Sequence, residues 1–248
     1  MILFVFEGGK AEPTVFDSIG KLFLPNEELC VVKCRHDLPT LYSNLRANGY
    51  DLFRSLPFED NGVILPKDKR LDTLFSQVFL FFDYDFQNRI GTQKVNNILD
   101  EMLDFFDDET ENGKLYINYP MIESIRYTKE LPDDAYVGYT VGREACKDFK
   151  RLACEFSAYD SLDHLLFKDG ETPAKEKYLK VKDNWEYLRT MNVCKANLLT
   201  TGLYTMPREK SDIGQLSIFS NQVTKYVKPN ESVSILNSFP IFIYEYMK

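Results

Sequence analysis

The chain has 248 residues, of which 44% are hydrophobic and 27% charged, and its formal net charge at pH 7 is -8. This composition excludes wholesale disorder, since a disordered chain has too few apolar residues to build a core. No apolar run approaches the roughly 20 residues that span a bilayer, so we expect no membrane span. The five scattered cysteines argue against a disulfide framework and favour a reducing, cytoplasmic location.

The negative charge is concentrated in one segment. Residues 100–111 (DEMLDFFDDETE) contain seven acids and no base, and outside this segment 31 acids stand against 30 bases. Residues 143–228 are weakly basic, with 15 bases and 12 acids. The net charge therefore does not exclude a nucleic-acid partner. We interpret the acidic segment as the solvated end of a helix, with docking of a basic partner surface as the alternative.

Apolar runs and helical periodicities alternate along the first half of the chain. The apolar runs predict strands at residues 1–6, 29–34, 78–82 and 114–118. Helical spacing predicts helices at residues 13–23, 37–48, 92–106 and 119–127, with a connecting loop rich in Pro, Gly and charge at residues 54–70. Strands that alternate with helices are typical of an α/β fold with a parallel sheet.

The second half of the chain has few strand signals. Helical spacing covers residues 143–158, 173–200 and 207–227, and the tail at residues 233–247 predicts a last strand and a terminal helix. We therefore expect a parallel-sheet core flanked by helices at residues 1–142. A mainly helical extension at residues 143–248 is expected to pack on this core.

Acidic side chains follow the predicted strands at the points where these end. Glu7 comes after the first strand and is followed by two glycines, and Asp83 and Asp85 come after the third. Ligands of parallel α/β sheets bind outside the carboxyl ends of the strands, where these acids converge. Glu12 and Glu123 are further candidates, and carboxylate oxygens suit Mg²⁺ or Mn²⁺. The sequence therefore predicts a metal site at this edge of the sheet.

The chemistry expected of such a site is phosphodiester cleavage. Two metal ions activate an attacking water and stabilise the leaving oxygen in this reaction. The glycines after Glu7 allow a phosphate to approach the backbone, and Lys10 would offset negative charge that develops there. The alternative is that each acid only caps a helix. Glu-Gly at the first strand end and Asp-x-Asp at a later one jointly favour catalysis.

A basic stretch in the second half is the candidate nucleic-acid contact. Arg143, Lys147, Lys150 and Arg151 recur at three- and four-residue steps and are predicted to form one face of a helix. Such a face would contact the phosphate backbone and bring nucleic acid to the metal ions. The alternative is a solvated helix face with ion pairs along the helix.

Four segments of the chain resemble a known group of proteins. EGGKAEPTVF (residues 7–16) is similar to the EGxKTEPxYF opening of the RloB-like proteins, which are small companions of an ATPase in bacterial anti-phage loci. VFLFFDYDFQ, KLYINYPMIES and SILNSFPIFIYEY resemble the AbiL-type second component of abortive-infection systems. The resemblance covers residues 1–127 and the C-terminal segment. Ala11 departs from it, and no glycine closely follows the Asp-x-Asp motif.

The resemblance implies a Toprim-like core and a Mg²⁺-dependent nuclease that is the toxic effector of an ATPase-linked anti-phage defence system. Glu7, Asp83 and Asp85 match the Toprim glutamate and Asp-x-Asp positions, and Glu12 matches the second glutamate of the RloB-like opening. The implied partners are DNA or RNA as substrate and an ATPase subunit, and self-association into a homo-oligomer is left open. The alternatives are a non-catalytic adaptor that binds the ATPase and a transferase that holds a nucleotide diphosphate through the Asp-x-Asp motif.

Overall fold

A computed structural model describes residues 1–66, 73–168 and 172–247, and its centre is a five-stranded sheet with the order β2-β1-β3-β5-β4. The strands are β1 (Ile2–Phe6), β2 (Leu29–Lys33), β3 (Gln77–Asp83), β4 (Asp107–Asp108) and β5 (Gly113–Asn118). Four of them run parallel, and β4 is an antiparallel edge strand of two residues. The expected α/β fold class with a mostly parallel sheet is confirmed.

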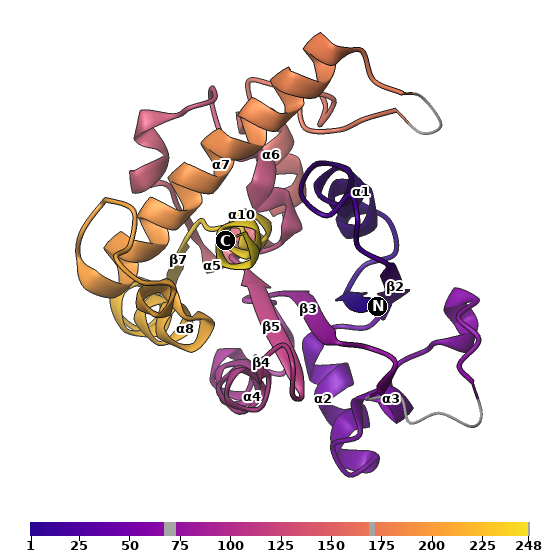
Figure 1. The fold of residues 1–248 in the computed structure, drawn as a ribbon. Helices are drawn as coiled ribbons and strands as arrows, with labels where there is room; N and C mark the ends of the chain where they lie inside the picture. Colours follow the sequence, from indigo (N-terminus) through magenta and orange to yellow (C-terminus); the bar gives the residue numbers. More distant parts are fainter. Residues whose placement is uncertain (67–72, 169–171, 248) are drawn as a thin grey trace.

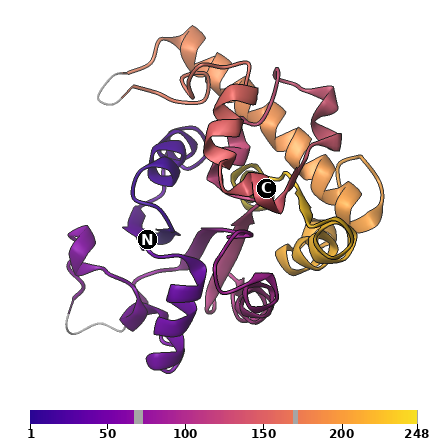
Figure 2. The same cartoon turned by 180° about the vertical axis from the view of Figure 1, so that it is seen from behind.

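Helices cover both faces of this sheet. They are α1 (Ala11–Phe23), α2 (Leu38–Ala47), α3 (Leu52–Ser55) and α4 (Thr92–Phe105). Figure 1 and, from behind, Figure 2 show α1 on one face and α2 and α4 on the other. The chain passes from β1 to β2 through α1 and then returns to β3 on the opposite side of β1. The strand order therefore reverses between β1 and β3, which is the topological switch point of the sheet.

The predicted start and end of α2 are confirmed by its capping contacts. The Asp37 carboxylate accepts a hydrogen bond from the Thr40 N–H at 3.0 Å, and Pro39 lies in the first turn. At the other end Gly49 adopts a φ of 65°, which a glycine tolerates better than other residues. The chain consequently turns here, as the Asn-Gly pair predicts.

The second half is mainly helical, as expected. It contains α5 (Arg143–Cys146), α6 (Phe149–Phe156), α7 (Lys175–Thr201), α8 (Gln215–Gln222), α9 (Lys228–Asn230) and α10 (Ser238–Tyr246). A small antiparallel pair joins β6 (Thr140–Gly142) to β7 (Ser232–Ser234), and short 3-10 turns lie at Glu59–Asn61, Ile122–Arg126, Asp134–Gly138 and Lys210–Ile213. None of the helices in the described ranges is long and apolar enough to cross a membrane.

Three predicted helical segments are wrong in extent. Residues 207–227 divide into the turn Lys210–Ile213, α8 and a π-helical turn at Val223–Val227. Residues 119–127 form only the 3-10 turn Ile122–Arg126, because the Tyr119 backbone exchanges hydrogen bonds with Leu236 and Pro120 has no N–H to donate. Residues 143–158 do not form one helix either. They divide into α5 and α6, so the four basic residues expected on one helix face lie on two short helices and the turn between them.

The acidic segment is more than the end of a helix. α4 ends at Phe105, and Asp107 and Asp108 then form β4 beside β5. Their exposed carboxylates lie on the free edge of the sheet, where charge opposes pairing with another strand. The predicted loop at 54–70 contains the last residues of α3 and the turn Glu59–Asn61, and residues 67–72 lie outside the described ranges.

The C-terminal helix α10 belongs to the core of the sheet. Phe239 stacks on Phe81 of β3 with ring centroids 4.5 Å apart, and Phe242 packs edge-on against Phe79 at 5.0 Å. Side chains from both halves of the chain form one buried cluster. α10 therefore lies beside α1 on the same face of the sheet (Figure 1). The boundary at residue 142 stays a prediction.

Truncation of Phe239 to alanine is expected to destabilise the protein by about 3–5 kcal/mol, because it removes a fully buried ring from this face. Tyr187→Ala is the control, since this ring on α7 is 42% exposed, and its cost should be at most about 1 kcal/mol. Urea unfolding followed by circular dichroism measures both. Equal losses for the two variants would contradict the packing role of α10.

Candidate active site

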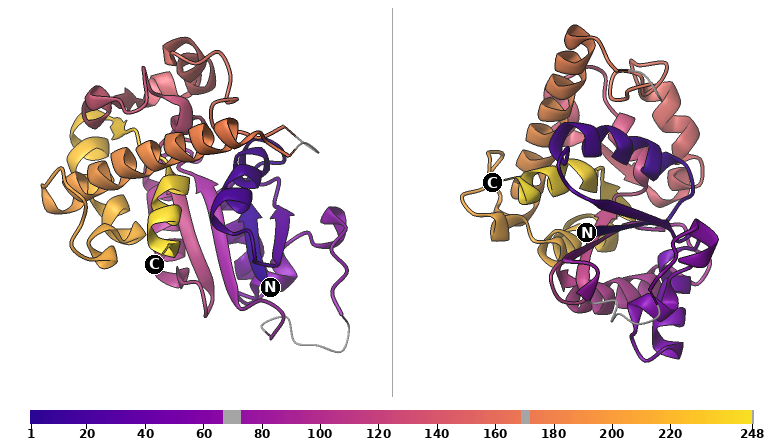
Figure 3. Two further views of the ribbon diagram at one scale, coloured as in Figure 1. Left: turned by 45° about the horizontal axis from the view of Figure 1, so that its top comes forward. Right: turned by 45° about the vertical axis from the view of Figure 1, so that its right-hand side comes forward.

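The centre of the candidate site is a contact between the ends of β1 and β3. Glu7 follows β1 directly, and its Oε2 accepts a hydrogen bond of 2.9 Å from the N–H of Asp83, the last residue of β3. The Glu7 N–H in turn donates to the Phe81 carbonyl at 3.1 Å. Both acids lie at the switch point, on the edge where the parallel strands end. We call this edge the carboxyl edge; in the left view of Figure 3 it faces away from the N-terminus.

Glu12 approaches the same edge from the first turn of α1. Its side chain is buried, and Oε1 accepts a hydrogen bond of 3.0 Å from the Gly8 N–H. A Cβ at position 8 would lie 2.5 Å from Oε2 of Glu12. A side chain at position 8 would displace the Glu12 carboxylate from the Gly8 N–H, so the glycine permits this contact between Glu12 and the backbone.

Asn118 fixes the carboxylate of Asp83. The two residues are register partners on β5 and β3, and Nδ2 of Asn118 donates to Oδ1 of Asp83 at 3.1 Å. Oδ1 of Asn118 accepts from the N–H and the hydroxyl of Ser238, at 3.0 and 2.8 Å. Because the backbone N–H can only donate, the amide group must present its NH₂ to Asp83. The start of α10 thereby orients an acid on β3.

Asp85 and Asp37 are linked through the side chain of Asn88. The amide of Asn88 donates to Oδ2 of Asp85 at 3.1 Å and to Oδ2 of Asp37 at 3.2 Å. The sequence pattern predicts residue 37 only as the start of a helix, and it does not single out Asn88 or Asn118. The position of Asn118 at the end of a predicted strand was the one available signal for its role.

Glu123 lies in the 3-10 turn beyond β5 and forms an ion pair of 3.6 Å with Lys150 of α6. Lys10, at the start of α1, is exposed. The structure thus brings Glu7, Glu12, Asp83, Asp85 and Glu123 to one edge, and we call these five residues the carboxylate cluster.

The other basic candidates are largely occupied by the protein itself. Lys147 pairs with Glu144 at 2.6 Å, and Arg151 pairs with Glu155 at 2.8 Å. The Nε of Arg143 donates to the Phe86 carbonyl at 3.2 Å, just beyond the Asp-x-Asp motif. These contacts agree with the alternative of a solvated helix face with local ion pairs, although Arg143 and Lys150 do reach the carboxyl edge.

The carboxylates of the cluster disfavour one another's charge. Burial raises the pKa of Glu7 from its ordinary 4.5 to about 8, and the charges of Asp85, Glu12 and Asp37 raise it too, against the Asp83 N–H, which lowers it. Burial also raises the pKa of Asp83 well above its ordinary value, with Glu7 and Glu12 as further causes.

The pKa values of Glu12 and Asp85 are raised as well. Burial is the main cause for Glu12, where the charge of Glu123 adds to it and that of Lys150 opposes it. Burial also dominates the raised pKa of Asp85, which the hydrogen bond from Asn88 lowers. The cluster consequently holds more negative charge than its protein neighbours compensate.

This excess of carboxylate oxygens fits a hard divalent cation. Asp83 and Glu7, joined through one hydrogen bond, present two rigid strand-end carboxylates, and Mg²⁺ commonly takes one or two protein carboxylates and completes its shell with water. In the described part of the chain, no three His, Cys, Asp or Glu side chains are close enough to share one ion. A divalent ion at this edge would therefore take at most two of these side chains and complete its shell with water.

Comparison with protein-family models, with curated proteins and with solved structures finds no match to this chain. The resemblance to the RloB-like group therefore stays a prediction from the quoted motifs. What the structure itself defines is an α/β protein with a carboxylate cluster at the switch point of its sheet.

The raised pKa of Glu7 predicts a pH-dependent stability difference between the protein and its Glu7→Gln variant in the absence of divalent ions. The folded state binds the Glu7 proton more tightly than the unfolded state, so this stabilisation is present at low pH and is lost as the pH rises to about 8. Between pH 5 and 8, the free energy of unfolding of the variant should therefore rise by on the order of 2–4 kcal/mol relative to that of the unchanged protein.

Urea unfolding in EDTA at several pH values measures this difference. The comparison between the two proteins is necessary because the lowered pKa values of His164, about 4, and Lys195, about 7, give the opposite slope in both of them. If the difference in free energy of unfolding between the two proteins stays constant from pH 5 to 8, the raised pKa of Glu7 is contradicted.

Proposed function

We propose that this protein is a metal-dependent phosphodiesterase that cleaves nucleic acid. The observation that carries the proposal is the contact between Glu7 and Asp83 at the switch point, with Glu12 and Asp85 beside it. Ligands of parallel α/β sheets bind at this position, and paired strand-end acids are suitable ligands for Mg²⁺ or Mn²⁺. The sequence pattern alone predicts the same acids as site residues.

The residues around the cluster have distinct parts in this proposal. A bound divalent ion would supply positive charge at the phosphate and lower the pKa of a water molecule. Glu7 and Asp83 would hold it, and Asn118 keeps the Asp83 carboxylate in one orientation. A carboxylate with a raised pKa, such as Asp85 or Glu12, is a better proton acceptor for the attacking water than an ordinary one.

The cleavage itself needs no covalent intermediate with the protein. The oxygen of the attacking water forms a bond to phosphorus and the water proton passes to the carboxylate. The P–O bond to the leaving nucleoside breaks, and the leaving oxygen takes a proton from solvent water. Lys10, exposed at the start of α1 three residues after Glu7, supplies positive charge near the phosphate. Bound cations also reverse the sign of the local field, which permits an acidic protein to bind a polyanion.

The biological setting of the proposal rests on the resemblance to the RloB-like group. In that setting the protein is the toxic nuclease effector of an anti-phage system and works in the cytoplasm with a partner ATPase. α6, which reaches the cluster through the ion pair between Lys150 and Glu123, carries exposed polar residues to which such a partner would bind.

Substitution of the two central acids tests the proposal. Glu7→Gln and Asp83→Asn should each lower Mg²⁺-dependent cleavage of single- and double-stranded DNA and RNA by about 100-fold or more. Asp104→Asn is the control, because Asp104 is an exposed acid on α4, and it should cleave as the unchanged protein does. Circular dichroism and thermal unfolding establish that all three variants fold.

The same variants distinguish the adaptor alternative. If the protein only binds an ATPase, the Glu7→Gln and Asp83→Asn variants will retain both protection against phage and toxicity to the cell. The purified protein will then cleave neither single- nor double-stranded DNA or RNA. That combination would refute the nuclease proposal.

A further inference from the structure

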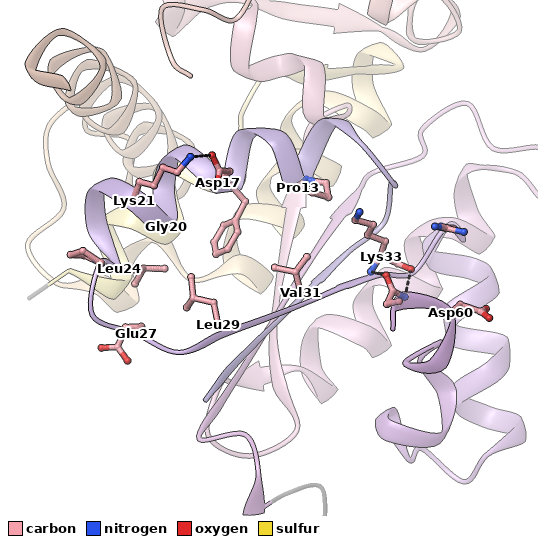
Figure 4. A pocket seen from close by; sticks show the side chains of 14 residues that line it. Pro13, Asp17, Gly20, Lys21, Leu24, Glu27, Leu29, Val31, Lys33 and Asp60 are labelled. Atoms are coloured by element: carbon pink, nitrogen blue, oxygen red, sulfur yellow. Dashed lines mark hydrogen bonds and ion pairs between the residues drawn. The ribbon is translucent and has the colours of Figure 1, made fainter. Parts of the chain in front are cut away.

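A groove of about 690 Å³ lies between α1 and the edge strand β2, outside the carboxylate cluster. Figure 4 shows Leu29 and Val31 of β2 along one wall and α1 along the other. Lys33 and Asp60 lie at one end of the groove, and Leu24 and Glu27 lie at the opposite end. None of the residues that line this groove takes part in the proposed cleavage.

The end of the groove that carries Lys33, Arg35 and Asp60, with two cations and one acid, adjoins the carboxylate cluster. Lys33 is the last residue of β2, and Arg35 follows two residues later; both line the groove. The Arg35 N–H donates to the Glu7 carbonyl at 2.8 Å. A Cβ at Gly9 would lie 4.0 Å from the Nε of Arg35, so the guanidinium side chain runs beside the Glu-Gly-Gly turn. An occupant of this end is therefore next to Glu7.

Lys33 and Arg35 form no ion pair with a carboxylate among the described residues. Lys147, Lys150 and Arg151, in contrast, each pair with a glutamate. Arg35 also adopts a φ of 59°, in the left-handed region that residues other than glycine, asparagine and aspartate seldom occupy. This backbone costs on the order of 1 kcal/mol, and such strain concentrates at binding sites. The two charges thus remain available for an anion.

Beyond this end the lining of the groove is mixed: apolar residues stand beside the charged Asp17, Lys21 and Glu27, and the volume is sufficient for a base. Leu29 and Val31 are half-buried on its β2 side, and Pro13, Phe16 and Leu24 belong to its α1 side. Lys21 on the α1 rim already pairs with Asp17 at 2.6 Å. A ligand that combines phosphate groups with a flat ring therefore matches the charge at one end and the apolar surface beyond it.

A peptide strand fits this edge less well. In the parallel pair with β1, the Glu28 carbonyl and the Cys34 N–H bond to β1, so the backbone groups of Leu29, Val31 and Lys33 point outward. The amide of Asn61 already occupies the N–H and the carbonyl of Lys33, at 2.9 and 3.2 Å. Only two residues are left to pair, which is too few for a stable strand addition.

We propose that the α1–β2 groove is a nucleotide-binding subsite for the nucleotide adjoining the phosphate at the carboxylate cluster. Lys33 and Arg35 pair with its phosphate groups, and its base lies against Leu29 and Val31. This inference rests on the proposed function, since it takes single-stranded nucleic acid as the ligand. It relocates the main nucleic-acid contact from α5 and α6 to the edge of the sheet.

Binding of short fluorescein-labelled single-stranded DNA and RNA, measured by polarisation in Ca²⁺, tests this subsite. The double variant Lys33→Gln/Arg35→Asn removes both charges and keeps at position 35 a residue that tolerates the left-handed backbone. The matched control is Arg54→Asn/Lys94→Gln, which removes two exposed charges elsewhere. A second comparison is Lys147→Gln/Arg151→Gln.

The first double variant should bind at least about 10-fold more weakly, and its plot of log affinity against log salt should be shallower by about 1.4, because each lost phosphate contact contributes about 0.7 for a single strand. The two comparison variants should change neither quantity appreciably. Photo-crosslinking of an oligonucleotide with 5-iodouracil should label peptides within residues 13–35.

Three results would overturn the inference. Unchanged affinity of the Lys33→Gln/Arg35→Asn variant, with a loss in Lys147→Gln/Arg151→Gln, would assign the contact to α6. Unchanged affinity in every variant, with concentration-dependent dimerisation of the protein, would assign the groove to protein association. Absence of oligonucleotide binding by the unchanged protein would refute the substrate class as well, whereas normal binding with an unaffected variant refutes the subsite alone.

Discussion

The hydrogen bond from the Asp83 N–H to the Glu7 carboxylate joins the ends of β1 and β3, and the rest of the site is arranged around it. It exists because the chain places β2 and β3 on opposite sides of β1, so that two strands end side by side with their crossover helices on opposite faces. Glu12 on α1 and Asn118 on β5 then reach the same edge from either side. The topology of the sheet, more than any single motif, brings these groups together.

The electrostatics of the cluster explain how an acidic protein can be suited to a polyanion. Burial, and to a smaller extent the charge of their neighbours, raises the pKa values of the partly buried Glu7 and Asp83, and Lys150 compensates only part of the negative charge at this edge. A divalent ion relieves that repulsion and makes the edge attractive to phosphate. The largest block of negative charge, at residues 100–111, lies elsewhere, on α4 and on the free edge formed by β4. The net charge of -8 therefore combines two separate acidic regions: the carboxylate cluster, where a cation would bind, and residues 100–111, which lie away from it.

Much of the fold followed from the sequence because its signals are local. The apolar run that forms β3 and the predicted start of α2 at residue 37 each depend on neighbours within a few residues. The failures have non-local causes: Tyr119 pairs with Leu236, more than a hundred residues away, instead of starting a helix. The sequence does not indicate Asn118 and Asp37 as neighbours of the acids for the same reason. The contact of Asn118 with Asp83, and the amide of Asn88 that Asp37 shares with Asp85, exist only in the folded chain. The α1–β2 groove likewise depends on packing that no motif encodes.

Calorimetric titration of the protein with Mg²⁺ or Mn²⁺ at pH 7, in buffers that differ in ionisation enthalpy, tests most directly whether the carboxylate cluster is a metal site. Binding should release about one proton for each ion bound, because the raised pKa values leave Glu7 partly protonated before the ion arrives. Asp83→Asn should weaken this binding strongly. Absence of binding, or binding without proton release that Asp83→Asn leaves unchanged, would contradict the assignment of a divalent cation to the ends of β1 and β3.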